Sequence, residues 1–149
     1  MRKVMVWAGI IVICCLPVST GHSYDQGQLG QFMTTNQCPG CDLSNASLSG
    51  ANLYRANLAG ANLTGVYLSD ANLAGANLSK ANLSGAFLNY AYLVQTDLTD
   101  ANLTNAKLFF AILIDAKLSG AVLTGAKLST ALWVNGTRCA EGSVGECKK

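Results

Sequence analysis

Four of the six cysteines of this chain, those that follow its apolar N-terminal run, are the residues whose type and spacing could perform chemistry. Cys38 and Cys41 form a Cys-Pro-Gly-Cys motif, and Cys139 and Cys147 lie near the C-terminus. Such a set has three chemical interpretations: structural disulfides, a Cys-X-X-Cys redox pair, or a four-cysteine zinc site. Four cysteines allow three disulfide connectivities, and counting alone does not choose among them.

Other catalytic groups are scarce. His22 is the one histidine of the chain, and it stands at the end of an apolar leader. The rest of the sequence therefore cannot supply a Ser-His-Asp or Cys-His arrangement, and it holds no cluster of metal ligands. We expect a protein that is not an enzyme and that uses no cofactor and no metal.

The N-terminus has the layout of a secretory signal peptide. Two basic residues, Arg2 and Lys3, precede an apolar run from Val4 to Val18, which small and polar residues follow. The run is shorter than the ~20 residues that span a bilayer. We expect residues 1–23 to be removed and the protein to be periplasmic or secreted, or lumenal if it comes from a thylakoid. A retained anchor is the alternative, and no membrane association is expected once the leader is gone.

Composition and charge narrow the class of protein further. The chain has 149 residues, of which 50% are hydrophobic and 12% charged, so it is a folded protein of one domain rather than a disordered one. The formal net charge is only +2, and without the leader the acidic and basic residues balance. A neutral chain gives no electrostatic reason to expect nucleic acid as a partner.

A period of five residues runs from Cys41 to Asn135 without an insertion, which makes 19 pentads. The third position is Leu in 18 pentads, and the first position is Ala in 16. Asn is frequent at the second position, Ser or Thr at the fourth and Gly at the fifth. A short fixed period of this kind indicates a solenoid.

The period fits an extended backbone and not a helix. Five residues advance a helix by about 140° net, so successive leucines would spiral around it and form no apolar face. In an extended segment, Ala and Leu two residues apart point to the same side. Gly and Asn then supply the corners, because both tolerate unusual backbone angles. We expect short extended sides that wind into stacked coils.

The pattern resembles the pentapeptide-repeat family, whose repeat reads Ala-(Asp/Asn)-Leu-X-X. Near-ideal copies begin at Ala51, Ala56 and Ala61. The resemblance implies an all-β fold, a right-handed quadrilateral β-helix with four pentads per coil and Ala and Leu inside. Nineteen pentads would make roughly 4.75 coils, or a rod about 23 Å long. Val66 and Thr96, at the inner small position, are expected to cause slight bulging.

The ends of such a rod need caps, because open coils invite association. We expect residues 24–40 to form an N-terminal cap, 41–135 the β-helix and 136–149 a disulfide-closed tail. Exported members of the family have similar cysteines at their ends, so the resemblance implies the disulfides Cys38–Cys41 and Cys139–Cys147. A shared zinc site would require the two ends of the rod to meet.

Residues twenty apart should stack in columns if each coil holds four pentads. Charged columns then pair Asp97 with Lys117 and Lys80 with Asp100. Two adjacent outer sides gather apolar residues, which form a candidate interface for a protein partner or for self-association. These residues are Phe87, Tyr90, Tyr92, Val94, Phe109, Phe110, Ile112, Ile114, Leu132 and Val134. Such a surface is typical of an interface, unless a terminal tail covers it.

Three functions remain to be compared. The favoured hypothesis is an exported, non-enzymatic interaction scaffold that binds through its apolar side. A thiol–disulfide redox protein that uses Cys38 and Cys41 is the first alternative, although it lacks the βαβ context of such motifs. The second is DNA mimicry, because some members of the family protect gyrase. The repeats oppose mimicry, since they carry five acidic and five basic residues rather than a strongly acidic surface.

Overall fold

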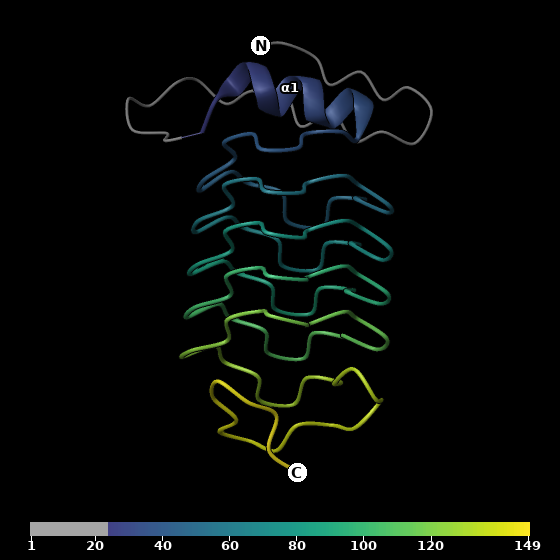
Figure 1. Cartoon of the computed structure of the whole chain (residues 1–149), viewed down its shortest axis with the longest axis vertical. Helices are drawn as coiled ribbons and strands as arrows, with labels where there is room; N and C mark the ends of the chain where they lie inside the picture. The colour runs from purple at the N-terminus through teal and green to yellow at the C-terminus, as the bar shows by residue number, and fades with distance from the viewer. Residues whose placement is uncertain (1–23) are drawn as a thin grey trace.

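The computed structural model describes residues 24–149, so the expected signal peptide 1–23 lies outside the described residues. Within this range, a stack of coils carries one helix, α1 (Gln26–Thr35), across its N-terminal end, and the C-terminal tail folds under the other end (Figure 1). Within residues 24–149, no helix has the length and apolar character that crossing a membrane requires.

Each coil takes twenty residues. Isolated parallel bridges join residues twenty apart in an unbroken series, from Gln37 with Asn57 to Ile112 with Leu132. The third residue of a pentad donates its N–H to the next coil, and the second donates to the coil before. Leu88 N thus bonds Lys107 O at 2.7 Å, and Lys107 N bonds Ala86 O at 2.8 Å. Four pentads therefore make one turn of the stack.

The corners fall at the fifth residue of the pentads, which has a positive φ in every pentad from Asn45 to Thr130. Tyr90, Phe110 and Thr130 adopt φ values of 60°, 59° and 60°, as the neighbouring glycines do. The next N–H closes the turn on the preceding leucine carbonyl, as from Ala91 to Leu88 at 3.2 Å. A turn with positive φ at its third residue favours Gly or Asn, which explains the composition of this position.

Ala and Leu fill the interior. The inward leucines from Leu43 to Leu113, and Leu128, are at most 2% exposed. The bulging expected at Val66 and Thr96 is wrong, because both are fully buried and the bridges beside them continue. Thr96 fits because its hydroxyl donates to Leu73 O at 2.8 Å, which satisfies the buried polar group.

Helix α1 covers the first coil and was not expected from the sequence, where residues 24–40 were described only as a cap. The Asp25 carboxylate accepts hydrogen bonds from Gly27 N and Gln28 N, which makes it the N-cap. Asn36 ends the helix in the left-handed conformation. Phe32 is 1% exposed and inserts into the core, so the helix closes the N-terminal end of the stack.

Candidate functional site

The apolar residues of the candidate interface all lie on the surface of two adjacent sides of the coils, and we call this set the aromatic surface. Tyr90 and Tyr92 are each 51% exposed and Phe110 is 45% exposed. The others are half-buried, which means that each keeps part of its side chain in contact with solvent. They are Phe87, Val94, Phe109, Ile112, Ile114, Leu132 and Val134.

The rings of this surface stack in columns because the coils repeat every twenty residues. Tyr90 and Phe110 lie parallel, with ring centroids 5.0 Å apart and an interplanar angle of 2°. Tyr67 stacks on Phe87 at 4.7 Å, and Lys107 Nζ lies 4.2 Å from the centroid of the Phe87 ring. Stacking and cation–π contacts hold these side chains in a fixed array.

A shallow groove of about 330 Å³ adjoins the aromatic surface. Tyr92 and Val94 form its apolar wall, and Asp70 supplies a carboxylate. Its remaining lining comes from small or amide residues of the earlier coils, which are Gly50, Asn52, Asn72 and Ala74. The groove offers a recess for a side chain of a docked partner rather than an enclosed site for a small molecule.

The described tail does not cover the aromatic surface. It runs along the end of the last coil, where Arg138 bridges Leu132 and Val144 bridges Lys127, both antiparallel. Helix α1 lies at the opposite end (Figure 1). Tyr90, Tyr92 and Phe110 therefore stay exposed although α1 and the tail are both packed on the ends of the stack.

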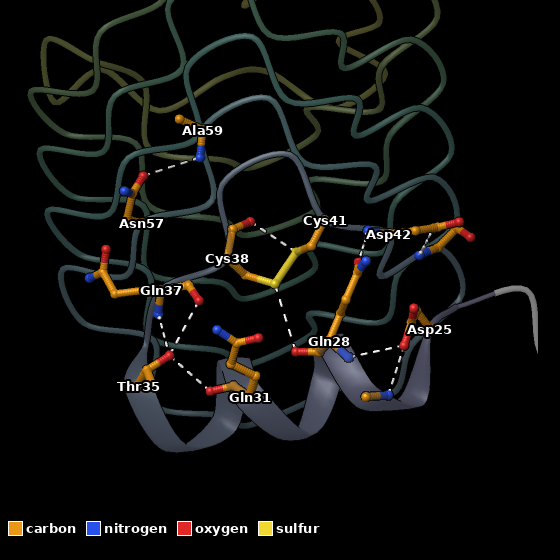
Figure 2. The surroundings of a disulfide bond; sticks show 12 residues. Asp25, Gln28, Gln31, Thr35, Gln37, Cys38, Cys41, Asp42, Asn57 and Ala59 are labelled. Carbon is orange, nitrogen blue, oxygen red and sulfur yellow. Dashed lines mark hydrogen bonds between the residues drawn. A yellow bond between two sulfur atoms is a disulfide. The ribbon is translucent and has the colours of Figure 1, made fainter.

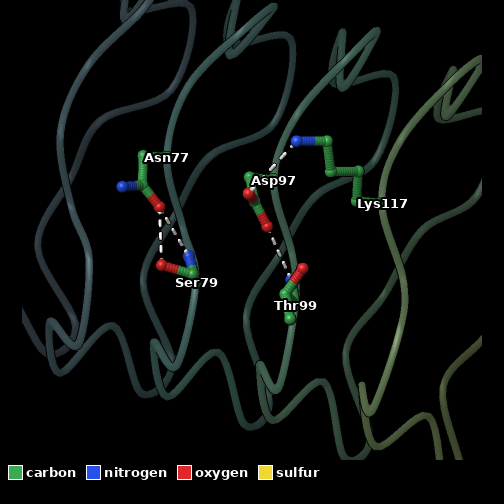
Figure 3. A network of polar contacts seen from close by, with 5 residues as sticks. All are labelled: Asn77, Ser79, Asp97, Thr99 and Lys117. Carbon is green, nitrogen blue, oxygen red and sulfur yellow. Dashed lines mark hydrogen bonds and ion pairs between the residues drawn. The ribbon is translucent and has the colours of Figure 1, made fainter.

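The two other sides of the coils are polar and bond to themselves. Asn102 Nδ2 donates to Asn82 Oδ1 at 3.2 Å, and Asn82 Nδ2 donates to Thr64 Oγ1 at 3.0 Å. Within a pentad, the side-chain oxygen Oδ1 of Asn77 accepts hydrogen bonds from both the backbone N–H and the Oγ hydroxyl of Ser79 (Figure 3). Such side chains use their hydrogen-bonding capacity on the fold, so they have little left for a ligand.

Two aspartates replace Asn at the second position and take over its bonds. Hydrogen bonds from the backbone and side chain of Ser44 lower the pKa of Asp42 below its ordinary value. For Asp97, the hydrogen bonds from Thr99 lower the pKa most, and Lys117 adds a weaker attraction (Figure 3). Lys117 Nζ lies 3.6 Å from Asp97 Oδ2, whereas the expected pair of Lys80 with Asp100 is not formed within residues 24–149.

Asp97→Asn is expected to remove part of the acid sensitivity of the fold. A carboxyl whose pKa is lower in the folded than in the unfolded chain stabilises the fold above its unfolded pKa, and that contribution disappears as the pH falls through the folded pKa. Below the ordinary value of 3.8, the urea midpoint of the wild type should therefore fall more steeply than that of the variant. An identical acid dependence in both proteins would contradict this role of Asp97.

The cysteines form two separate disulfides, one at each end. Cys38–Cys41 lies between α1 and the first coil, with both residues less than 10% exposed. Cys38 Sγ lies 3.7 Å from Gln28 O, and the side-chain oxygen of Gln28 accepts a hydrogen bond from Asp42 N (Figure 2). This disulfide thus forms part of the contact between the helix and the stack.

The second disulfide, Cys139–Cys147, closes the tail, and Cys139 is buried beneath the last coil. No group of three or more metal-ligating side chains gathers anywhere in the described part of the chain. The first pair adjoins α1 and the second lies in the tail, and these two segments lie at opposite ends of the stack, which opposes a shared zinc site (Figure 1).

The comparisons with known proteins agree with this geometry. A family model for pentapeptide repeats matches eight copies, over residues 38–65, 61–100, 76–109 and 101–131. The chain belongs to the pentapeptide-repeat family. A search among curated proteins finds no match to this pentapeptide-repeat sequence.

Solved pentapeptide-repeat structures resemble this one. A protein from the thylakoid lumen of Arabidopsis thaliana is 32% identical, with a TM-score of 0.64 over 75% of each chain. A trypsin-treated variant of QnrB1, a plasmid-mediated fluoroquinolone resistance protein, is 23% identical with a TM-score of 0.53. That match covers 72% of this chain and 53% of QnrB1, and it shows the fold alone. The pentapeptide-repeat relatives imply a right-handed quadrilateral β-helix.

Sequence reasoning left out aromatic residues that extend the surface of this pentapeptide-repeat protein. Tyr67 is 45% exposed and stacks on Phe87, although it was absent from the expected set. Its spacing of twenty residues from Phe87 is the signal that could have found it. Tyr54 is 48% exposed, and the centroid of its ring lies 5.1 Å from Arg55 Cζ.

Proposed function

We propose that this pentapeptide-repeat protein is an exported, non-enzymatic scaffold that binds a protein partner through the aromatic surface. The observation that carries the proposal is the exposure of Tyr90, Tyr92 and Phe110 in an ordered array that neither α1 nor the tail covers. Aromatic residues are enriched where proteins bind proteins, because they bury a large area at a small loss of side-chain entropy. The polar sides, by contrast, use their hydrogen bonds internally.

Export is part of the proposal. The leader-like residues 1–23 and the four cysteines of the remaining chain favour an oxidising compartment. The similar protein from Arabidopsis thaliana comes from the thylakoid lumen. A periplasmic, secreted or lumenal location fits these observations. The nearly balanced charge of the repeats opposes DNA mimicry here as well.

The redox alternative is opposed by the burial of the Cys38–Cys41 pair beneath α1. Thiol–disulfide exchange requires an accessible sulfur for an attacking thiolate, and Cys38 and Cys41 are each less than 10% exposed. We expect a reduction potential below about −300 mV, as for structural disulfides. Equilibration with dithiothreitol buffers, followed by mass spectrometry of alkylated thiols, measures it. A potential near the poise of an oxidising compartment, roughly −200 mV, would favour the redox function instead.

A pair of matched double variants tests partner binding. Tyr92→Lys with Ile112→Lys places two cations on the aromatic surface, at second positions where Lys107 shows that lysine is accommodated. The control, Asn82→Lys with Asn102→Lys, makes the same change on a polar side. Both are used as bait in cells of the source organism, and circular dichroism verifies that each is folded.

The expected result is a partner protein that co-purifies with the wild type and with the control. The same partner should be lost from the aromatic variant, which is Tyr92→Lys with Ile112→Lys. Because the substitutions add unpaired charge where apolar area is buried, we expect binding to fall at least about tenfold. Retention of the same partner by the aromatic variant, with loss from the control, would contradict the proposal.

A further inference from the structure

The groove that adjoins the aromatic surface arises from a step in side-chain size. On this side of the stack, the second position of the pentad is Asn52 and then Asn72 in two successive coils, and it is Tyr92 in the next coil. The larger side chains of the later coil stand beside the smaller ones of the earlier coils. Tyr92 and Val94 consequently form an apolar wall, and the recess of about 330 Å³ lies against it.

Asp70 gives this groove a negative charge. Among the lining residues, all of which belong to the described range 24–149, it is the one that is charged. Within that range, its carboxylate accepts no hydrogen bond, and the one ion pair joins Lys117 to Asp97. Arg55, at the far corner of the same side, has its guanidinium beside the Tyr54 ring. The described chain therefore leaves the charge of Asp70 available to a ligand.

The other groups of the groove also suit a cation. Among the hydrogen bonds of the described chain, Asn72 Oδ1 accepts one, from Ala74 N at 3.1 Å, and an amide oxygen can accept a second. An N–H of the Asn72 side chain is directed to Asn52 Oδ1, at 3.4 Å. Within residues 24–149, no ring and no cation stacks on Tyr92, in contrast to the stacked rings of the aromatic surface. The negative face of an unstacked ring attracts ammonium and guanidinium groups.

We infer that the groove binds a lysine or arginine side chain of an extended segment of the partner, an inference that rests on the proposed function of the aromatic surface. The methylene stem of such a side chain can lie along the wall of Tyr92 and Val94 while its charged head meets Asp70. The same carboxylate repels an acidic side chain, and an apolar side chain would cover it without offering it a partner. The groove thus selects which segments can dock beside the aromatic surface.

A panel of capped tripeptides tests the groove directly. Acetyl-Gly-X-Gly-amide, in which X is lysine, arginine, glutamate or norleucine, is titrated into the purified, isotope-labelled exported chain, and the amide resonances are followed by NMR. The lysine peptide, the arginine peptide or both should shift the amides of Asp70, Asn72 and Tyr92. We expect dissociation constants in the millimolar range, because one exposed ion pair and one cation–π contact give weak binding. The glutamate and norleucine peptides should leave these amides unchanged.

Asp70→Asn separates the charge of the groove from its shape. Asn tolerates a positive φ such as the 61° of Asp70, so the variant should keep the fold. We expect it to weaken binding of the cationic peptide about fivefold, since the ion pair is lost and the apolar wall remains. Asp100→Asn is the matched control, because Asp100 has the same repeat position at another corner, with a φ of 58°. This control should bind the peptides as the wild type does.

Three results would overturn the inference: no response to either cationic peptide, an equal response to norleucine, or equal binding by Asp70→Asn and Asp100→Asn. Capture of the partner separates such a failure from a failure of the proposed function. As bait, Asp70→Asn should retain about fivefold less partner than Asp100→Asn. Equal retention by these two, together with loss from Tyr92→Lys with Ile112→Lys, would overturn the role of the groove and leave the aromatic surface as the binding site.

Discussion

Leu88→Asp is expected to leave no soluble, folded protein. Leu88 is completely buried in the middle of the stack, between coils that contact it on both sides. An ionised carboxylate there has no partner, and a protonated one leaves its polar atoms unpaired in an apolar interior. Burial of either form removes much of the 5–15 kcal/mol by which a typical domain is stable. Expression with the leader, followed by measurement of soluble exported protein and of its circular dichroism spectrum, provides the test.

Asn82→Asp is the matched control, because it introduces the same side chain at an outward position. Asp42 and Asp97 already occupy this position in other coils and accept the hydrogen bond from the residue two positions later. The control should express and fold as the wild type does. If both variants behaved alike, the assignment of inward and outward residues would be wrong.

Phe32→Ala is expected to destabilise the chain by about 3–5 kcal/mol, as removal of a buried aromatic side chain commonly does. Phe32 is the one fully buried side chain of α1, and it packs on the core of the first coil. Its loss should release the helix and expose the end of the stack to solvent. Urea unfolding followed by circular dichroism measures the change in the free energy of unfolding.

Gln31→Ala, on the exposed face of the same helix, is the control and should change stability little. Hydrogen exchange distinguishes a local effect from a global one, because repeat proteins transmit stability mainly to neighbouring repeats. The amides of residues 26–35 should lose protection in Phe32→Ala, while those around Leu88 keep theirs. Equal stability of the two variants would mean that the helix is not what closes this end.

The repeat made the solenoid predictable, because one short pattern fixes both the backbone and the core. Alternation of Ala51, Asn52 and Leu53 determines which side chains point inward, and Gly at the fifth position marks the corners. The twenty-residue coil did not follow from the period of five. The resemblance to a family implied it, and the parallel bridges between residues twenty apart show it in the structure.

The ends were less predictable, since they follow no repeat. Helix α1 contains Gly27 and Gly30, which lower its intrinsic propensity, and it is held by packing on the first coil. Its signals were Asp25 as an N-cap and the helical spacing of Leu29, Phe32 and Met33. At the C-terminal end, the tail pairs antiparallel with the last coil at Lys127 and Leu132, which no local pattern encodes.

The position of the aromatic surface could be predicted from the sequence, but the backbone conformation and the ring stacking of its residues could not. Spacing places Tyr90 and Phe110 in one column, yet neither residue is a usual choice for a positive φ. The backbone strain at these corners persists because the stacked coils determine the conformation, and the parallel rings of the two residues pack on each other. Sequence alone cannot weigh these tertiary contacts against the local preference.

Position-resolved photo-crosslinking in the source cells tests most directly the claim that the aromatic surface binds a partner. A photoreactive phenylalanine analogue replaces Tyr92 or Phe110 on that surface, or Asn82 on a polar side. The account predicts the same discrete protein adduct at positions 92 and 110 and none at 82. A folded, exported protein that forms no adduct at 92 or 110, or an equal adduct at 82, would contradict it.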